Sequence, residues 1–225
     1  MSFFSWAWGW ISNGANWRGP GDIPQQILAH LEYSGLALLI AVVVAVPLGV
    51  ALGHSGRGSA VVTNLANAAR AIPTLGLLIL LTVLAGFSPL AWLLPLVVLG
   101  IPPVLVNAYE GVAGVDPDVK DAARGAGMTT RQQILRVEVP CAMPLILTGL
   151  RTSAVFVVAT ATIAAYVGLG GLGRFIVDGL ASSQYGPVAG GALLVVGLAI
   201  AVLILFSVLS RVLVPAGLRG SERSE

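Results

Sequence analysis

The sequence predicts an all-α membrane protein, and three observations lead to this fold class. The 225 residues are 56% hydrophobic and only 10% charged, whereas soluble domains carry about 25% charged residues. The mean hydropathy is +0.91. Residues 33–56 and 71–109 contain no Asp, Glu, Lys or Arg. So few polar side chains cannot cover a globule, which argues against a soluble protein with an unusually apolar core.

Five membrane spans are predicted, because about 20 apolar residues cross the hydrocarbon core. The uncharged run at 71–109 is about twice that length, and the GFSP sequence at 86–89 divides it as a turn. The predicted spans cover 31–53, 62–86, 89–109, 141–165 and 189–213. A membrane domain at 31–215 therefore lies between an N-terminal segment, 1–30, and a tail, 216–225.

The N-terminal segment is rich in tryptophan. It contains four of the five Trp residues, Trp6, Trp8, Trp10 and Trp17. Trp prefers the membrane–water interface, and the segment lacks the basic start of a signal peptide. We expect it to lie on the membrane surface, and a sixth span through it is the alternative.

Lys and Arg choose the orientation, because cytoplasmic segments of membrane proteins are enriched in both. With the charged segment at 111–140 inside the cell, the outer segments hold only Arg18 and Arg174. The inner segments hold Arg57, Lys120, Arg124, Arg131, Arg136, Arg211, Arg219 and Arg223. This bias predicts an N-terminus outside the cell, and a C-terminus and segment 111–140 in the cytoplasm.

The charged segment is predicted to form two short helices. Asp116 and Pro117 suit the N-cap and first position of one helix, which Gly125 and Gly127 would end. Thr129 opens a sequence that fits a capping box and begins the second helix. Pro140 is expected to stop that helix.

Two other interpretations of this segment are a solvated loop and a DNA-binding helix–turn–helix. Both ends run straight into membrane spans, and the basic residues form no stripe for nucleic acid, so we reject the second. Ala122, Ala123 and Ala126 argue against a plain loop, because small side chains let a helix sit closely in a groove of another protein.

The same segment resembles the EAA loop of ABC importer permeases. The usual pattern is Glu-Ala-Ala, three residues, Gly, nine residues and Ile-x-Leu-Pro, and this chain keeps the spacing with Asp for Glu and Val for Ile and Leu. The matching residues are Asp121, Ala122, Ala123, Gly127, Val137, Val139 and Pro140. In that family the loop forms a coupling helix that docks on an ATPase subunit, so the resemblance implies this role for these residues and a type I ABC importer permease core.

Further stretches resemble the osmoprotectant branch of these permeases, which imports glycine betaine, carnitine and choline. They cover 70–81, 115–129, 137–153 and 161–180. The resemblance implies a bacterial inner-membrane complex with two ATPase subunits, a second permease subunit, identical or related, and an extracytoplasmic substrate-binding protein. ATP and Mg would bind the ATPase and no cofactor this chain. Consistent with that, its only Lys, Lys120, lies in no P-loop sequence.

Charged and aromatic residues inside the spans are candidates for a translocation path. Arg70 and Arg151 lie within predicted spans, where an ionisable side chain usually faces a partner or a water-filled path. Interhelical contact or snorkelling is the alternative for both. Tyr109 and Tyr166 are the aromatic candidates for this path.

A glycine-rich turn follows the fourth predicted span. Gly168, Gly170, Gly171 and Gly173 match G-x-G-x-x-G, but a dinucleotide site also needs a preceding strand and an acidic residue about 20 positions on. We expect a turn at the outer mouth that acts as a hinge or allows tight packing. The G-x-x-x-G pairs Gly49/Gly53 and Gly186/Gly190 predict close helix approach.

Three rival functions remain to be compared with the importer permease. An ion-driven secondary transporter would place acidic residues at mid-membrane, and none is convincingly central here. A membrane scaffold would need no alanine-rich cytoplasmic loop. A methionine-type importer permease stays open as the alternative cargo class. The single Cys141 and the separated His30 and His54 indicate no disulfide or metal site.

Overall fold

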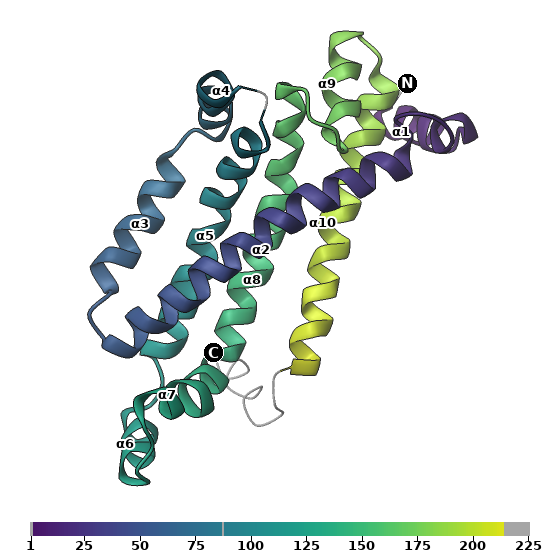
Figure 1. Ribbon diagram of the computed structural model, residues 1–225. Helices are drawn as coiled ribbons and strands as arrows, with labels where there is room; N and C mark the ends of the chain where they lie inside the picture. Colours follow the sequence, from purple (N-terminus) through teal and green to yellow (C-terminus); the bar gives the residue numbers. More distant parts are fainter. Residues whose placement is uncertain (1, 87, 214–225) are drawn as a thin grey trace.

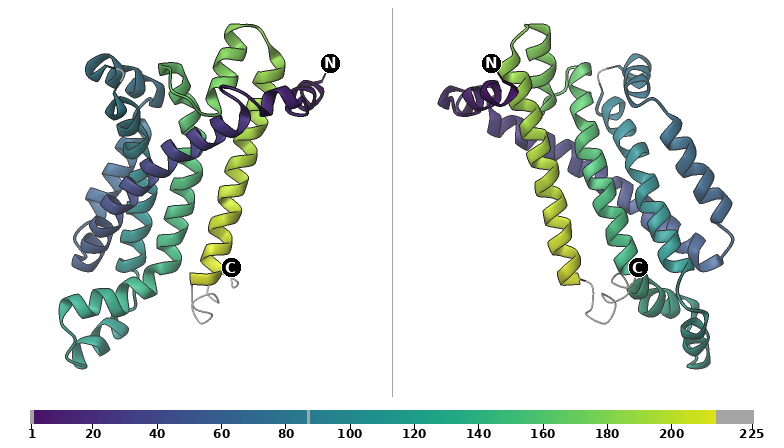
Figure 2. Two further views of the ribbon diagram at one scale, coloured as in Figure 1. Left: turned by 45° about the vertical axis from the view of Figure 1, so that its right-hand side comes forward. Right: turned by 180° about the vertical axis from the view of Figure 1, so that it is seen from behind.

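The computed structural model describes residues 2–86 and 88–213, without the side chains of 69, 70, 85, 89 and 90. Four apolar helices in this part are long enough to cross a membrane. They are α2 (Ile23–Ser55), α5 (Pro89–Ala113), α8 (Val139–Ala161) and α10 (Tyr185–Leu213). In Figures 1 and 2, α10, α8, α5 and the shorter α3 lie side by side, and α2 crosses them obliquely. The membrane-spanning all-α fold class is confirmed.

The span predicted over 62–86 is wrong as a single helix. The chain forms α3 (Ser59–Ala71) and α4 (Thr74–Ala85), of 13 and 12 residues. The break lies at Pro73, which lacks an N–H and forces the preceding Ile72 into extended backbone, with ψ of 121°. The described residues therefore hold four helices of spanning length and this broken pair, where five spans were predicted.

The N-terminal residues form α1 (Phe3–Ile11), a helix of nine residues. This is far shorter than the roughly 20 residues of a membrane crossing, so the six-span alternative is wrong. The ring of Trp6 stacks on Tyr185 at 5.1 Å, and the edge of Trp10 meets Phe175 at 4.8 Å. Gly190 of α10 lies directly beneath the Trp10 ring. The Gly186/Gly190 pair therefore makes room for an aromatic side chain of α1 as well as for helix α1 itself.

The remaining elements gather at the two ends of the bundle (Figure 1). Residues 114–138, which we name the coupling segment for their predicted role, contain α6 (Pro117–Gly125) and α7 (Thr130–Gln133) and project from one end. The opposite end holds α1, the 3-10 turn η1 (Gly14–Trp17), α4, the 3-10 turn η3 (Thr162–Val167) and α9 (Gly173–Ala181). The predicted tail at 216–225 lies outside the described residues.

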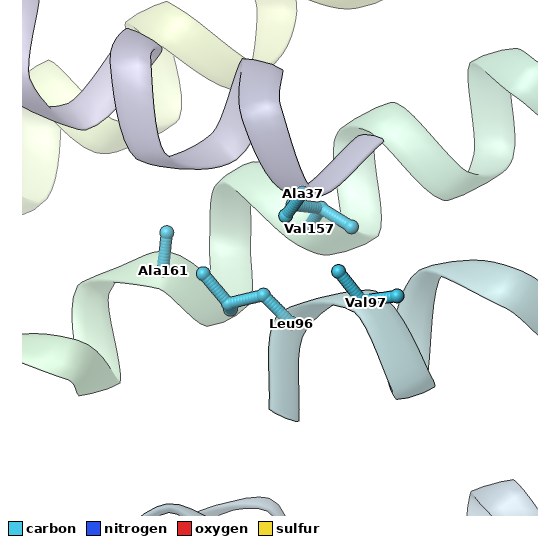
Figure 3. Close-up of a cluster of buried hydrophobic side chains, with 5 residues drawn as sticks. All are labelled: Ala37, Leu96, Val97, Val157 and Ala161. Carbon is cyan, nitrogen blue, oxygen red and sulfur yellow. The ribbon is translucent and has the colours of Figure 1, made fainter. Parts of the chain in front are cut away.

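Small side chains bring α2, α5 and α8 together. A Cβ at Gly49 would lie 2.7 Å from the Ala108 Cβ, and one at Gly53 would lie 2.8 Å from the Tyr109 carbonyl oxygen. The predicted close approach at Gly49 and Gly53 is therefore confirmed. Nearer the N-terminal end of α2, the helices α2, α5 and α8 meet in a cluster of buried side chains. Figure 3 shows its members, Ala37, Leu96, Val97, Val157 and Ala161.

Replacing Gly49 by Leu should destabilise the bundle, because no room exists for a side chain against α5. Overpacking of this kind costs about 1–3 kcal/mol, and we expect a lower apparent Tm in detergent solution. Gly197→Leu is the matched control, since nothing lies within 4 Å of a Cβ there. An unchanged Tm for Gly49→Leu would contradict the close contact.

Candidate coupling site and translocation path

The coupling segment begins where α5 ends. Asp116 caps α6 by accepting a hydrogen bond from the Asp118 N–H at 2.9 Å, and Pro117 occupies the first turn. Lys120 Nζ donates to the Val112 carbonyl oxygen of α5 at 2.9 Å. A cation at a helix C-terminus is favourable, because the last carbonyls lack partners and carry partial negative charge. Lys120 thus ties α6 to the end of α5, a contact that the sequence did not reveal.

The turn after α6 explains why a glycine occupies position 127. The Met128 N–H donates to the Ala123 carbonyl at 3.2 Å, and the Gly127 N–H to the Arg124 carbonyl at 2.9 Å. This pair of bonds is the Schellman motif, which needs a left-handed residue between the two elements. Gly127 has φ of +74°, a conformation that residues with a Cβ rarely adopt. The predicted glycine end of this helix is confirmed.

The predicted capping box at Thr129 is also confirmed. Its hydroxyl accepts from the Gln132 N–H at 3.4 Å, and Gln132 Oε1 accepts from the Thr129 N–H at 2.9 Å. These reciprocal bonds satisfy two amides at the start of α7.

Pro140 does not end the second helix, and that prediction is wrong. A π-helical turn, η2 (Ile134–Glu138), follows α7 and leads directly into α8. In an α-helix the Pro140 ring would meet the carbonyl four residues earlier. The wider turn, in which the Val139 N–H bonds to the Ile134 carbonyl, accommodates the proline. Helical structure is continuous over Thr130–Val167, so the coupling segment is joined to a membrane helix without a loop.

The three alanines of the coupling segment face different ways. Ala123 is buried, whereas Ala122 and Ala126 are exposed. With Val119, which is 41% exposed, these two residues form one stripe at helical spacing. Gly127 belongs to the same exposed surface, because a Cβ there would meet nothing within 4 Å. We name Val119, Ala122, Ala126 and Gly127 the docking face. Ala123, one of the expected coupling residues, is packed against the chain itself and is not part of this exposed face.

The other matching residues have separate environments. The exposed Asp121 pairs with Arg124 at 2.8 Å, and such surface pairs contribute little to stability. Val139 packs on a buried cluster between α2, α5 and α8. Val137 is half-buried, and Pro140 is exposed.

The glycine-rich turn at 168–173, the predicted outer turn, packs tightly on α2. The Gly171 N–H donates to Gln26 Oε1 at 2.6 Å, and the Leu172 N–H to His30 Nδ1 at 3.3 Å. Since Nδ1 accepts, Nε2 carries the proton and donates to the Val158 carbonyl at 2.9 Å. The Gly173 Cα lies against the Thr162 carbonyl with no room for a Cβ. These contacts support the tight-packing interpretation of the turn.

The backbone of the same turn also needs glycine. Gly168 and Gly171 have φ of +81° and +94°, while Gly170 lies beside Gln26. A helical segment, η3, precedes the turn, where a dinucleotide site would need a strand.

The four candidate path residues are not brought together. Tyr109 packs near the C-terminal end of α5, and Tyr166 is 58% exposed in η3 at the other end of the bundle. Arg151 is half-buried midway along α8, with no ion pair or hydrogen bond to the described residues. The side chain of Arg70 lies outside the described residues.

Two cavities lie near the end of the bundle that holds α9 and η3. One of about 680 Å³ has Tyr33 in its wall, and one of about 260 Å³ has Trp92 in its wall. The Tyr33 and Trp92 rings contact each other at a centroid distance of 4.7 Å. This aromatic pair thus lies between the two cavities, a contact that residue spacing in the sequence could not show.

Comparison with known proteins gives one consistent result. Residues 36–219 match the family described as binding-protein-dependent transport system inner membrane component. The glycine betaine/carnitine/choline transport system permease protein OpuCB of Bacillus subtilis (strain 168) is 36% identical, over 89% of this chain and 92% of that protein. The choline transport system permease protein OpuBB of the same organism is 34% identical, over 88% and 92%.

Among solved structures, the inward-facing MetNI methionine ABC transporter matches with a TM-score of 0.73. The identity is 20%, and the match covers 86% of this chain and 96% of that one. An amino acid ABC transporter matches with a TM-score of 0.68 at 20% identity, over 94% and 98%. These structures show the fold, which is that of a type I ABC importer permease.

Gly127→Ala should loosen the coupling segment, whereas Gly125→Ala should not. A left-handed conformation costs a residue with a Cβ about 1 kcal/mol, and Gly125 lies in the helix with open space around it. We expect the Met128 amide to exchange with deuterium about fivefold faster in the Gly127 variant. Equal exchange in both variants would contradict the Schellman geometry.

Proposed function

From the fact that the chain belongs to the binding-protein-dependent transport system inner membrane component family, we propose that it is the permease subunit of an ATP-driven osmoprotectant importer. The proposed cargo class is quaternary amines such as glycine betaine, carnitine and choline. The names of relatives at 34–36% identity over most of the chain support this class. The methionine transporter shares the fold at 20% identity, which is no support for methionine as cargo.

The observation that carries the proposal is how closely the docking face is joined to a membrane helix. An exposed stripe of small side chains lies on α6, the tight turn at Gly127 leads from α6 to α7, and helical structure is continuous from α7 through η2 into α8. Small side chains permit close seating in a partner's groove. A solvated loop would need neither the stripe nor the continuity.

We place two ATPase subunits, which bind ATP and Mg, against the docking faces of two permease subunits. This orientation puts the coupling segment and the C-terminus in the cytoplasm and the N-terminus outside, as the distribution of Lys and Arg indicates. The opposite end of the bundle would then receive cargo from a substrate-binding protein.

A second permease subunit, identical or related, would cover the face of α3. Thr63, Asn64 and Asn67 are exposed on this helix, and Arg151 has no partner in the described part of the chain. Polar groups at membrane depth face the interior of an assembly or a water-filled path. We therefore assign Arg70 and Arg151 to this interior, with Tyr109 and Tyr166 at its two ends.

The mechanism follows from helix continuity. When ATP closes the ATPase pair, the two coupling segments move together. Each α8 must follow its own coupling segment, because α7 is helically continuous with α8 and only a tight hydrogen-bonded turn separates α7 from α6. This movement would convert the path from inward-facing to outward-facing, while the aromatic pair of Tyr33 and Trp92 closes or opens near the outer cavities.

Ala122→Trp should separate the ATPase from the permease, because the indole would project from the docking face. We expect at least about tenfold less ATPase to co-purify, with normal membrane insertion. Val196→Trp is the matched control, since Val196 is 53% exposed on the spanning helix α10. Undiminished co-purification with Ala122→Trp would place the ATPase elsewhere.

The cargo class is tested by competition for uptake in cells that carry the complete importer. Unlabelled choline, carnitine and glycine betaine in large excess should each be compared with methionine as competitors of labelled glycine betaine. We expect inhibition by at least one other quaternary amine and none by methionine. Uptake of labelled methionine with no uptake of labelled glycine betaine would overturn the proposed cargo.

A further inference from the structure

A buried carboxylate lies at the point where the coupling segment enters the bundle. Glu138, the last residue of η2, is 0% exposed. Its Oε2 and Oε1 atoms lie 2.8 Å and 3.0 Å from His54 Nδ1 at the end of α2. Gln133 Nε2 of α7 donates to Oε1 at 3.2 Å. We name His54, Gln133 and Glu138 the joint cluster.

The chemistry of the joint cluster makes it a specific contact. An ionised carboxylate only accepts hydrogen bonds, so His54 Nδ1 carries the proton that it donates. Burial of a carboxylate without such partners would be costly, and removing one partner of a buried pair costs more than replacing both.

Apolar packing isolates the joint cluster from the membrane-facing part of the bundle. Ile134, the first residue of η2, and Val139, which directly follows η2, pack on a buried cluster that includes Val50 of α2 and Val112 of α5. Gly53, next to His54, lies against the α5 backbone. The polar bonds of the joint cluster are therefore made at a closely packed junction of α2, α5 and η2.

Helix α2 has specific polar contacts at both of its ends. The inner end holds His54 on Glu138, and the outer end holds Gln26 and His30 on the glycine turn. Between them, most buried positions facing α5 and α8 are small, including Ala37, Ala41 and Ala45. The helix is thus attached to the coupling segment at one end and to the outer turn at the other.

We propose that His54 and Glu138 are positioning residues that transmit displacement of the coupling segment to α2, and through α2 to the outer glycine turn. The inference rests on the proposed docking of an ATPase at the coupling segment. Helix α8 is covalently continuous with that segment, whereas α2 reaches it through the joint cluster. The cluster makes α2 move with α8 during each ATP cycle, so that the inner and outer ends of the path respond together.

The test measures solute imported per ATP hydrolysed by the complete complex in proteoliposomes. The double variant His54→Leu/Glu138→Met removes both polar partners and leaves no buried charge unpaired. We expect it to assemble with the ATPase and hydrolyse ATP, while import per ATP falls about tenfold. The single variant His54→Leu should give less folded complex than the double, because the buried carboxylate then keeps only the neutral Gln133 as a donor.

The control variant is Thr152→Val, which removes an exposed hydroxyl elsewhere on α8 and should keep the wild-type ratio. A wild-type ratio in the double variant would overturn the inference and reduce the cluster to a stabilising contact. If the double variant does not assemble, Glu138→Gln decides by the same ratio. A wild-type complex that neither hydrolyses ATP nor imports solute would instead refute the proposed function.

Discussion

The structure depends on how a helix passes a proline at the membrane boundary. Pro140 cannot donate to the preceding turn and would collide with it in a regular α-helix. One π-helical turn, Ile134–Glu138, removes the conflict and keeps helical structure continuous from α7 into α8. The same turn points Glu138 inward to His54. A single local rearrangement thus joins the coupling segment to α8 by covalent continuity and to α2 by buried hydrogen bonds.

Close packing makes this attachment mechanically effective. Gly49 and Gly53 bring α2 against α5, and Gly149 brings α8 against the Pro103 carbonyl of α5. Interiors packed at this density transmit displacement and do not absorb it. The broken pair α3 and α4 differs, since Thr63, Asn64 and Asn67 are exposed. Three closely packed helices therefore stand beside a face suited to a second subunit.

Local rules explain what the sequence could predict. The caps at Asp116 and Thr129, the left-handed Gly127 and the close approach at Gly49 each depend on neighbours within a few residues or on one helix face. The two prolines show the limit. Pro73 breaks a helix and Pro140 does not, because the outcome depends on whether a wider turn can form before the ring. Contacts between distant residues were missed: His54 and Glu138 are 84 positions apart, and the inward side of α6 at Ala123 is set by its packing on the rest of the segment.

The central claim is that the coupling segment and α8 move as one rigid unit, and an electron-spin distance measurement tests it directly. Spin labels would replace Arg131 in α7 and Phe156 in α8, both exposed, in a Cys141→Ala background and with labelled chains diluted among unlabelled ones. The account predicts the same intrachain distance with and without ATP, while distances between subunits change. A change within the chain of about one helical turn, roughly 5 Å, would show that η2 bends and would contradict the account.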